Sequence, residues 1–466
     1  MPLAGPQGAA ARRGLLGATL LGLLLGCAGP SRAPDLARLY ASTRATTDQP
    51  PVILIHGILG SRLRTADERK EIWVGQLRKL LFSDYSDLKL AIDPDTLEPV
   101  RDGLEPYAIF DRAAGTDFYG RIITVLQNAG GFTRGEPGLA AAAGTRRFYV
   151  FRYDWRRDNV ENASRLDALI DQIRVDYADP ALKVDIVAHS MGGLLTRYYL
   201  RYGTQDVLND NEFPVNLWGA TRVRRVVLLG TPNLGSVNSV RAFIDGVKLG
   251  FGRIRTEVLA TMPSVYQLFP HPVAGAWLIN AQGEQLDRDV FSARIWRRFQ
   301  WSIFDPKVRA RIRAGFEDPA AAQAYLDTLE RYFEKHLERA RRFVWSLTVP
   351  LEETPWQLIV FGGDCELTPA RMLVEEVDGV STLRLDPRDI DAPDASVDYA
   401  RIMLEPGDGT VTKASLLARN ALDPTVPRHR YVFFPLDYSL FICESHDQLT
   451  GNVTFQDNLL HVLLSR

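Results

Sequence analysis

Short apolar segments recur along the chain, and each is rich in β-branched and aromatic side chains. They lie at 52–55, 148–151, 184–187, 226–229, 358–361 and 431–434. Such nearly continuous apolarity is typical of strands covered on both faces, as in a parallel sheet. Helix-length segments separate several of them, such as Leu194–Arg201, which Gly203 follows where helices often end. The alternation predicts a doubly wound α/β fold.

Residues 236–350 have a different pattern, because helical periodicity replaces the strand signal there. One predicted helix places six apolar side chains on a single face: Leu326, Leu329, Phe333, Leu337, Ala340 and Val344. We expect this region to be a helical cap inserted into an α/β core, with the core formed by 51–235 and 351–466. A second, loop-rich insertion is expected at about 64–118.

Composition excludes several classes of protein. The chain has 466 residues, 46% of them apolar, which favours a large globular α/β protein with insertions or two to three domains. Its formal net charge is −2, so no overall field would attract nucleic acid. Three cysteines without a CxxC motif, and no ligand cluster with suitable spacing, predict neither a metal nor an organic cofactor.

The first residues read as a targeting segment. Residues 1–26 contain no acidic residue and carry an apolar run too short to span a membrane comfortably. The run ends in Leu24-Leu25-Gly26-Cys27, which resembles a bacterial lipobox. We expect a lipoprotein-type signal peptide over 1–26, an acylated Cys27, and a flexible tether over 27–50. The protein would then be an exported lipoprotein, anchored at the periplasmic face or the outer membrane. An ordinary secretory signal or an uncleaved anchor is the alternative.

The segment Val184–Gly193 carries the strongest chemical signal. A buried strand runs directly into a helix through Ser190, which has the form of a nucleophile elbow. This turn needs small residues at Ala188 and Gly192, since larger side chains would collide with the neighbouring strand and helix. Ser190 is therefore the candidate nucleophile. The N–H of Met191, at the start of the helix, is a candidate oxyanion donor.

A second oxyanion donor is expected from the loop that follows the first strong strand. His56-Gly57 ends that strand, and Ile58 is the residue whose N–H we expect to donate. A serine also needs a base, and the fold's chain order places an acid and then a histidine after it. His446, in a polar loop after the last apolar strand, is the candidate general base.

Two acids follow late strands and precede His446. Asp408, in the turn Gly407-Asp408-Gly409, is the preferred orienting carboxylate, and Asp364 is its rival. Cys365 and Cys443 lie just beyond predicted strand ends, so an oxidising compartment would allow them to form a disulfide that holds the His446 loop.

Together these segments resemble the lecithin:cholesterol acyltransferase-like family of the α/β-hydrolase superfamily. The matching segments, in the family's order, are Pro51–Ser61, Tyr153–Arg156, His189–Gly193, Leu229–Ser236, Met262–Leu268, Gly407–Val411 and His446. The resemblance implies an α/β-hydrolase core with a cap, Ser190, Asp408 and His446 as a triad, and oxyanion donors at Ile58 and Met191. We interpret Tyr153–Arg156 as a brace for the sheet.

The predicted function is that of a serine acyl hydrolase or O-acyltransferase acting on ester lipids, with phospholipids as the favoured substrates. An acyl-serine would form and be released to water or to an acceptor alcohol. The alternatives are a carboxylesterase, a triacylglycerol lipase, or a surface lipoprotein that binds lipid or a partner without catalysis. No nucleic-acid partner is expected.

Overall fold

The computed structural model describes residues 33–465, except for a few short segments. These are 46–48, 75–78, 80–81, 114–115, 143, 352, 421 and 423–433. The predicted signal peptide and Cys27 lie outside the described residues, and so does most of the strand expected at 431–434.

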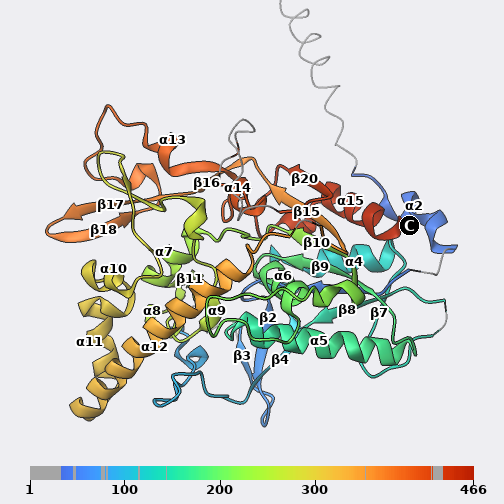
Figure 1. The fold of residues 1–466 in the computed structure, drawn as a ribbon, viewed down its shortest axis with the longest axis horizontal. Helices are drawn as coiled ribbons and strands as arrows, with labels where there is room; N and C mark the ends of the chain where they lie inside the picture. Colours follow the sequence, from blue (N-terminus) through green and yellow to red (C-terminus); the bar gives the residue numbers. More distant parts are fainter. Residues whose placement is uncertain are drawn as a thin grey trace, which may run out of the picture.

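A seven-stranded sheet forms the centre of the molecule, in the order β20-β15-β10-β9-β1-β8-β7 (Figure 1). Its strands are β1 (Val52–Ile55), β7 (Thr133–Arg134), β8 (Arg147–Phe151), β9 (Val184–His189), β10 (Val223–Leu229), β15 (Gln357–Gly363) and β20 (Tyr438–Ile442). All neighbouring strands in the sheet are parallel. Five of the predicted apolar segments lie in these strands.

The last strand differs from the prediction. β20 covers Tyr438–Ile442, whereas Phe434, the described residue of the expected strand, lies outside any strand. β20 is an edge strand with exposed and half-buried side chains. Because an edge strand is not covered on both faces, it does not need an unbroken apolar run.

Helices cover both faces of the sheet (Figure 1). Val52 and Leu54 of β1 pack with α4 (Gly120–Asn128) and α15 (Val453–Leu464), whereas Ile53 and Ile55 pack with α5 (Asn159–Asp176) and α6 (Met191–Tyr202). Successive side chains of a strand point to opposite faces, so the four-residue apolar run supplies two cores. The predicted doubly wound α/β fold is confirmed.

Between β10 and β15 the chain leaves the sheet and forms six α-helices among its described residues. They are α7 (Val237–Asp245), α8 (Thr256–Leu259), α9 (Pro263–Tyr266), α10 (Ala293–Arg298), α11 (Pro306–Ala314) and α12 (Pro319–Ser346). The six apolar residues predicted to share one helix face all belong to α12, and all are buried. The same stretch contains short strands that the sequence pattern did not indicate: β11 (Val247–Leu249), β12 (Gly252–Ile254), β13 (Leu278–Ile279) and β14 (Gln285–Leu286).

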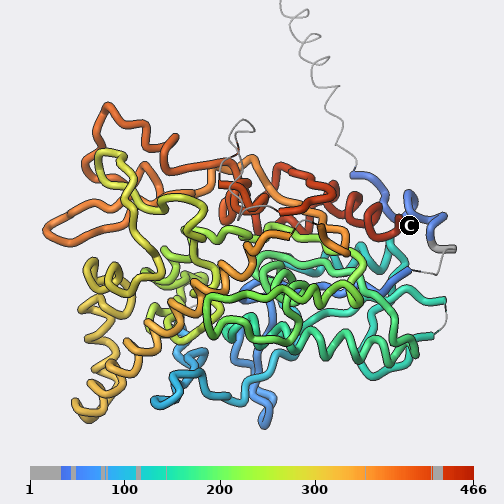
Figure 2. Tube along the Cα trace, in the orientation of Figure 1, coloured from blue at the N-terminus to red at the C-terminus, as the bar shows by residue number. Residues whose placement is uncertain are grey.

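One of these short strands joins two distant parts of the chain. β13 pairs in parallel with β17 (Met372–Val377), which pairs antiparallel with β18 (Val380–Arg384). Figure 2 shows the yellow-green and orange parts of the chain side by side here. A segment that follows β15 therefore shares a small sheet with a segment that precedes it.

The remaining α-helices and strands in the described residues are short. They comprise α2 (Leu36–Leu39), β2 (Ser61–Thr65), β3 (Glu71–Trp73), β4 (Leu104–Ile109), β5 (Arg112–Ala113), β6 (Thr116–Asp117), β16 (Glu366–Pro369), β19 (Leu404–Gly407), α13 (Tyr399–Met403) and α14 (Lys413–Leu416).

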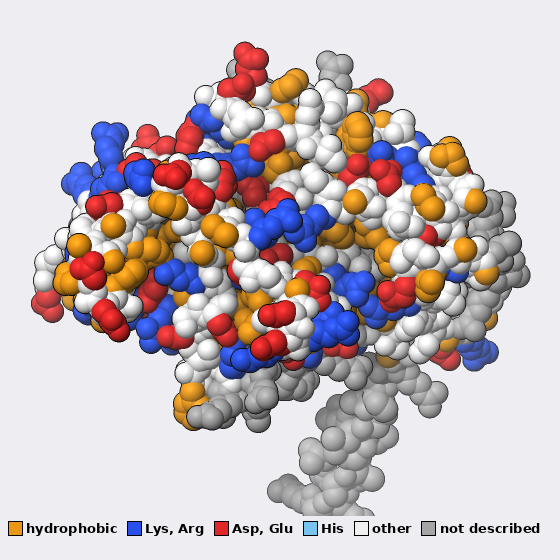
Figure 3. Space-filling view, turned by 90° about the horizontal axis from the view of Figure 1, so that it is seen from below, with side chains coloured by type: hydrophobic (Ala, Val, Ile, Leu, Met, Phe, Trp, Pro, Cys, Tyr) orange, Lys and Arg blue, Asp and Glu red, His pale blue; other side chains and the backbone are white. Residues whose placement is uncertain are grey.

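In the described part of the chain, none of the helices combines the length and apolarity that crossing a membrane requires. The face in Figure 3 carries acidic and basic side chains interspersed with one another.

Candidate active site

Ser190 occupies a sharp turn between β9 and α6. Its backbone has φ 55° and ψ −127°, a conformation that costs energy for a residue with a side chain. The N–H of Ser190 donates to the carbonyl oxygen of Leu229 on the adjacent strand, at 2.8 Å. The turn is therefore fixed from the sheet side, and strain of this kind is typical of a nucleophile elbow.

Glycines allow three segments to meet at this turn. A Cβ atom on Gly192 would lie 2.5 Å from the carbonyl oxygen of His56, and one on Gly193 would lie 2.0 Å from Oγ1 of Thr231. A Cβ atom on Gly57 would lie 2.7 Å from Cβ of Ser190. The loop after β1 thus packs directly against Ser190, as an oxyanion loop requires.

The structure brings together the three residues that the sequence analysis selected. Nε2 of His446 lies 3.0 Å from Oγ of Ser190, and Nδ1 of His446 lies 2.8 Å from Oδ2 of Asp408. The backbone N–H of His446 donates to the carbonyl oxygen of Asp408 at 2.9 Å. These distances allow a base to take the serine proton while a carboxylate holds the far side of the ring.

The turn that contains Asp408 holds its carboxylate in place. Oδ1 accepts the backbone N–H groups of Thr410 and Val411, at 3.0 and 2.7 Å, so Oδ2 is left to face His446. Burial alone would raise the pKa of Asp408, but His446 and these two N–H groups outweigh burial, and the pKa is lowered. The side chain is therefore an anion at neutral pH.

The contact between His446 and Asp408 also determines the pKa of His446. Burial would lower its pKa, but the charge of Asp408 and the hydrogen bond to it outweigh burial and raise the pKa above its ordinary value. A histidine with this partner becomes a stronger base, and the imidazolium formed after proton transfer is stabilised.

Asp364, the alternative carboxylate, has another partner. Its Oδ2 lies 2.7 Å from Nζ of Lys413. Cys365, the next residue, forms a disulfide with Cys443, and their Cα atoms are 5.0 Å apart. The bond joins the segment after β15 to the segment after β20, three residues before His446.

The two candidate oxyanion donors come from two segments that meet at Ser190. Met191 is the first residue of α6, where a backbone N–H has no acceptor within the helix. Ile58 follows Gly57, whose Cα faces Ser190. Both N–H groups belong to segments in contact with the serine, which is the placement that an oxyanion hole needs.

The segment Tyr153–Arg156 braces the loop after β1. The hydroxyl of Tyr153 donates to the carbonyl oxygen of His56 at 2.8 Å, and the two rings stack with centroids 4.2 Å apart. Nε1 of Trp155 donates to the carbonyl oxygen of Ser61 at 3.1 Å. Arg156 is fully buried between Asp154 and Asp102. The hydrogen bonds of Tyr153 and Trp155 hold the two ends of the loop that contains Ile58.

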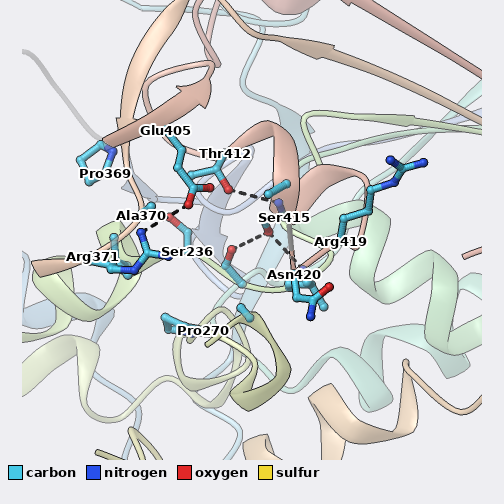
Figure 4. A pocket seen from close by; sticks show the side chains of 15 residues that line it. Ser236, Pro270, Pro369, Ala370, Arg371, Glu405, Thr412, Ser415, Arg419 and Asn420 are labelled. Carbon is cyan, nitrogen blue, oxygen red and sulfur yellow. Dashed lines mark hydrogen bonds and ion pairs between the residues drawn. The ribbon is translucent and has the colours of Figure 1, made fainter. Parts of the chain in front are cut away.

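A small cavity is lined in part by Glu405 and Thr412, which flank the turn that contains Asp408 (Figure 4). Its lining includes Ser236 and Ser415, and Arg371 pairs there with Glu405 at 3.4 Å. Ser236, at the start of α7, donates through Oγ to the carbonyl oxygen of Thr410 at 2.6 Å. Ser190, Asp408 and His446 do not line this cavity. Its walls instead anchor the Asp408 turn to α7.

The other histidines after Ser190 lie in different surroundings. His271 is buried, with Nδ1 accepting the N–H of Val273 at 3.0 Å. His336 is buried in α12, and burial lowers its pKa to about 3. His461 lies on α15, and His429 is outside the described residues. Over the residues that the structure describes, no group of three or more His, Cys, Asp or Glu side chains could hold a metal ion.

Two residues near the triad were not selected from the sequence. Nδ1 of His189 lies 2.8 Å from the hydroxyl of Tyr119, and Nε2 of His189 lies 3.2 Å from the carbonyl oxygen of His446. The position of His189 next to Ser190 could have drawn attention to it. Tyr119 is far away in sequence and lies directly after the predicted loop-rich region at 64–118, so its position carried no such signal.

Comparison with known proteins identifies relatives. A sequence model described as lecithin:cholesterol acyltransferase matches residues 143–419, more than half of the chain. A human protein, "Lysosomal phospholipase A and acyltransferase", is 32% identical over 116 residues, which are 25% of this chain and 23% of that relative. The chain therefore matches less than a quarter of that relative's length.

Two solved structures are similar to this chain. One chain from "The crystal structure of Tle4-Tli4 complex" superposes with a TM-score of 0.53 at 16% identity, covering 90% of this chain and 98% of that chain. A Bacillus licheniformis lipase, BlEst2 in mature form, gives a TM-score of 0.33 at 14% identity, covering 94% and 96% of the two chains. The parallel sheet with helices on both faces agrees with the α/β-hydrolase core implied by the match to the lecithin:cholesterol acyltransferase model.

Proposed function

Since this chain belongs to the lecithin:cholesterol acyltransferase family, we propose that it is a serine-dependent lipid acyl hydrolase or O-acyltransferase acting on ester lipids. One observation carries the proposal: Ser190, His446 and Asp408 form a hydrogen-bonded row with distances of 3.0 and 2.8 Å. Phospholipids are the proposed substrates, because the human relative's name combines phospholipase A with acyltransferase.

The first half of the reaction forms an acyl-serine. Oγ of Ser190 attacks the ester carbonyl carbon while Nε2 of His446 takes the hydroxyl proton. Asp408 holds Nδ1 and stabilises the resulting imidazolium, and the N–H groups of Ile58 and Met191 receive the oxyanion. The carbon–oxygen bond to the alcohol then breaks, and the alcohol leaves with the proton from His446.

The second half releases the acyl group. Water or an acceptor alcohol attacks the acyl-serine, and His446 takes the proton of the attacking hydroxyl. Collapse of the tetrahedral intermediate breaks the ester bond to Ser190, whose oxygen regains the proton from His446. Water yields a fatty acid, and an alcohol yields a new ester. The partition depends on how well the site excludes water.

An assay with labelled phosphatidylcholine, with and without a sterol or another alcohol, tests this proposal. We expect release of labelled fatty acid, or of a labelled ester when the alcohol is present, and loss of both products in Ser190→Ala. Turnover of short-chain esters alone would indicate a carboxylesterase, and turnover of triacylglycerol alone would indicate a lipase of that class. Either result would contradict the phospholipid assignment.

A fluorophosphonate probe tests the serine separately. Labelling of the wild type and its loss in Ser190→Ala are expected. Ser302→Ala is a matched control, because Ser302 is also buried, has φ 55°, and its Oγ has no partner among the described residues. This control should keep its labelling. An unlabelled wild type would favour a protein that binds lipid or a partner without catalysis.

We also propose that the protein is an exported lipoprotein whose Cys27 carries the lipid. The sequence Leu24-Leu25-Gly26-Cys27 supports acylation, and the disulfide between Cys365 and Cys443 suits an oxidising compartment. Metabolic labelling with a fatty acid should mark the wild type but not Cys27→Ala. A labelled Cys27→Ala variant, or a wild type that stays unlabelled and soluble, would contradict this.

A further inference from the structure

A chain of three hydrogen bonds runs beside the triad, from the loop after β1 to the backbone of His446. The backbone N–H of Gly57 donates to the hydroxyl oxygen of Tyr119 at 2.9 Å. That hydroxyl lies 2.8 Å from Nδ1 of His189, and Nε2 of His189 lies 3.2 Å from the carbonyl oxygen of His446. Tyr119 and His189 are both buried.

The two ends of this chain determine the proton positions in its middle. A backbone N–H can only donate, and a carbonyl oxygen can only accept. The Tyr119 hydroxyl accepts from Gly57, so its own proton is free to go to Nδ1 of His189. Nδ1 is then an acceptor, and Nε2 carries the proton that it donates to His446. Every donor in the chain points in the same direction, from the loop towards the base.

The opposite tautomer of His189 would reverse one of these bonds and break another. With the proton on Nδ1, the Tyr119 hydroxyl would face two donors and have no acceptor, while Nε2 would face the carbonyl oxygen with a lone pair. A doubly protonated ring is also disfavoured, since burial lowers the pKa of His189 to about 3. The arrangement is therefore satisfied by one protonation state.

Both ends of this row of hydrogen bonds belong to the catalytic apparatus. Gly57 lies against Ser190 and precedes Ile58, so its peptide orientation sets the direction of the neighbouring N–H. His446 is held on its other side by the backbone bond from its N–H to Asp408, at 2.9 Å. The rings of His189 and His446 lie with centroids 4.9 Å apart. The row of hydrogen bonds thus extends from the oxyanion loop to the general base, His446.

We propose that Tyr119 and His189 are positioning residues that couple the oxyanion loop to the His446 loop through one directed row of hydrogen bonds. This inference rests on the proposed acyl transfer, since it assigns the two residues a part in the same site. They do not touch the reacting atoms. They keep the Ile58 N–H and the His446 ring at a fixed separation while charge moves between them.

Tyr119→Phe removes the row's central hydroxyl and keeps the ring. We expect kcat to fall about 10- to 100-fold, the range that follows small displacements of reacting groups, while KM changes less than about twofold. Tyr199→Phe is the matched control, because the buried Tyr199 hydroxyl also makes a 2.8 Å bond, to Asp167. The control should keep kcat within about twofold of the wild type, as its bond lies outside the row.

Two substitutions of His189 distinguish the effect of hydrogen-bond direction from the effect of side-chain packing. A Gln side chain has one acceptor and one donor, so His189→Gln can accept from Tyr119 and donate to His446. His189→Leu has comparable bulk and neither group. We expect His189→Gln to retain several times the kcat of His189→Leu. Equal kcat values in the two variants would show that only packing matters and would overturn the inference.

Nuclear magnetic resonance of ¹⁵N-labelled histidines gives a readout that does not depend on turnover. The wild type should show His189 as the neutral tautomer protonated at Nε2, and Tyr119→Phe should disturb both this signal and the Nδ1–H signal of His446. A wild-type His189 protonated at Nδ1 would overturn the inference. An unchanged kcat in Tyr119→Phe would do the same. If the wild type fails to turn over any ester while the tautomer is as expected, the proposed function fails and the row stands.

Discussion

His446 and Ser190 are 256 positions apart in the chain, and Nε2 of one lies 3.0 Å from Oγ of the other. The contact exists because both residues follow strands of the same parallel sheet, whose carboxyl ends share an edge. Ser190 follows β9, and His446 lies in the loop after β20. Ligand sites of open α/β sheets form at this edge.

Replacing Asp408 by Asn should reduce kcat by about 10⁴-fold, the effect of this change in a serine triad, because the amide favours the wrong tautomer of the histidine. The variant should still fold, since the amide oxygen can accept the N–H groups of Thr410 and Val411. Steady-state kinetics and circular dichroism check both statements. Asp364→Asn, which breaks the pair with Lys413 instead, serves as the control and should keep most of its activity.

Activity should fall as the pH decreases through the pKa of His446. The base must be neutral to accept the proton of Ser190, and Asp408 raises the pKa of His446 above its ordinary value. The acidic limb of kcat/KM should therefore have its midpoint above about 6.5, the pKa of an unperturbed histidine. In Asp408→Asn the raising charge is lost while burial remains, so the residual activity should persist to lower pH. A midpoint that does not move between the two proteins would contradict this assignment.

Gly57→Ala should damage the site without a large loss of stability. The added Cβ would lie 2.7 Å from Cβ of Ser190, so the loop or the serine must move. Overpacking of this kind costs about 1–3 kcal/mol, and a shift of about 1 Å at the site can reduce kcat about 100-fold. Thermal unfolding and kinetics measure the two effects. Gly315→Ala, where the nearest contact would be 3.3 Å, should leave both near wild-type values.

Opening the disulfide should affect both stability and activity. Cys365 and Cys443 are separated by 78 residues, and a closed loop of this length is worth about 4 kcal/mol in the chain-entropy account. The double variant Cys365→Ala/Cys443→Ala should unfold at lower denaturant concentration. Its kcat should also fall, because the loop that holds His446 loses its tie to the segment after β15. A variant with unchanged kcat would show that hydrogen bonds alone position His446.

The residues that could be selected from the sequence are those fixed by local pattern and chain order. Ser190 stands between a buried strand and a glycine-rich helix start, and His446 and Asp408 follow in the order that the fold requires. Asp364 could not be ranked firmly below Asp408 from position alone, since both follow strands. The difference lies in a long-range pair, because Lys413 neutralises Asp364.

Features that depend on long-range contacts could not be predicted from the sequence pattern. Tyr119 meets His189 across 70 positions, and nothing in its neighbourhood marks it. β20 was placed too early, because an edge strand need not be apolar throughout. The two-residue strands β13 and β14 are too short to show any period, and β17, with which β13 also pairs, lies beyond β15.

The pairing of β13 with β17 has a practical consequence for protein engineering. Because β13 and β17 exchange backbone hydrogen bonds, excising 236–350 would leave β17 with an open edge, a surface prone to aggregation. A transplant of these helices onto another hydrolase would need to carry the hairpin at 372–384 with them. Chimeras cut at the obvious sequence boundaries would separate two strands that belong together.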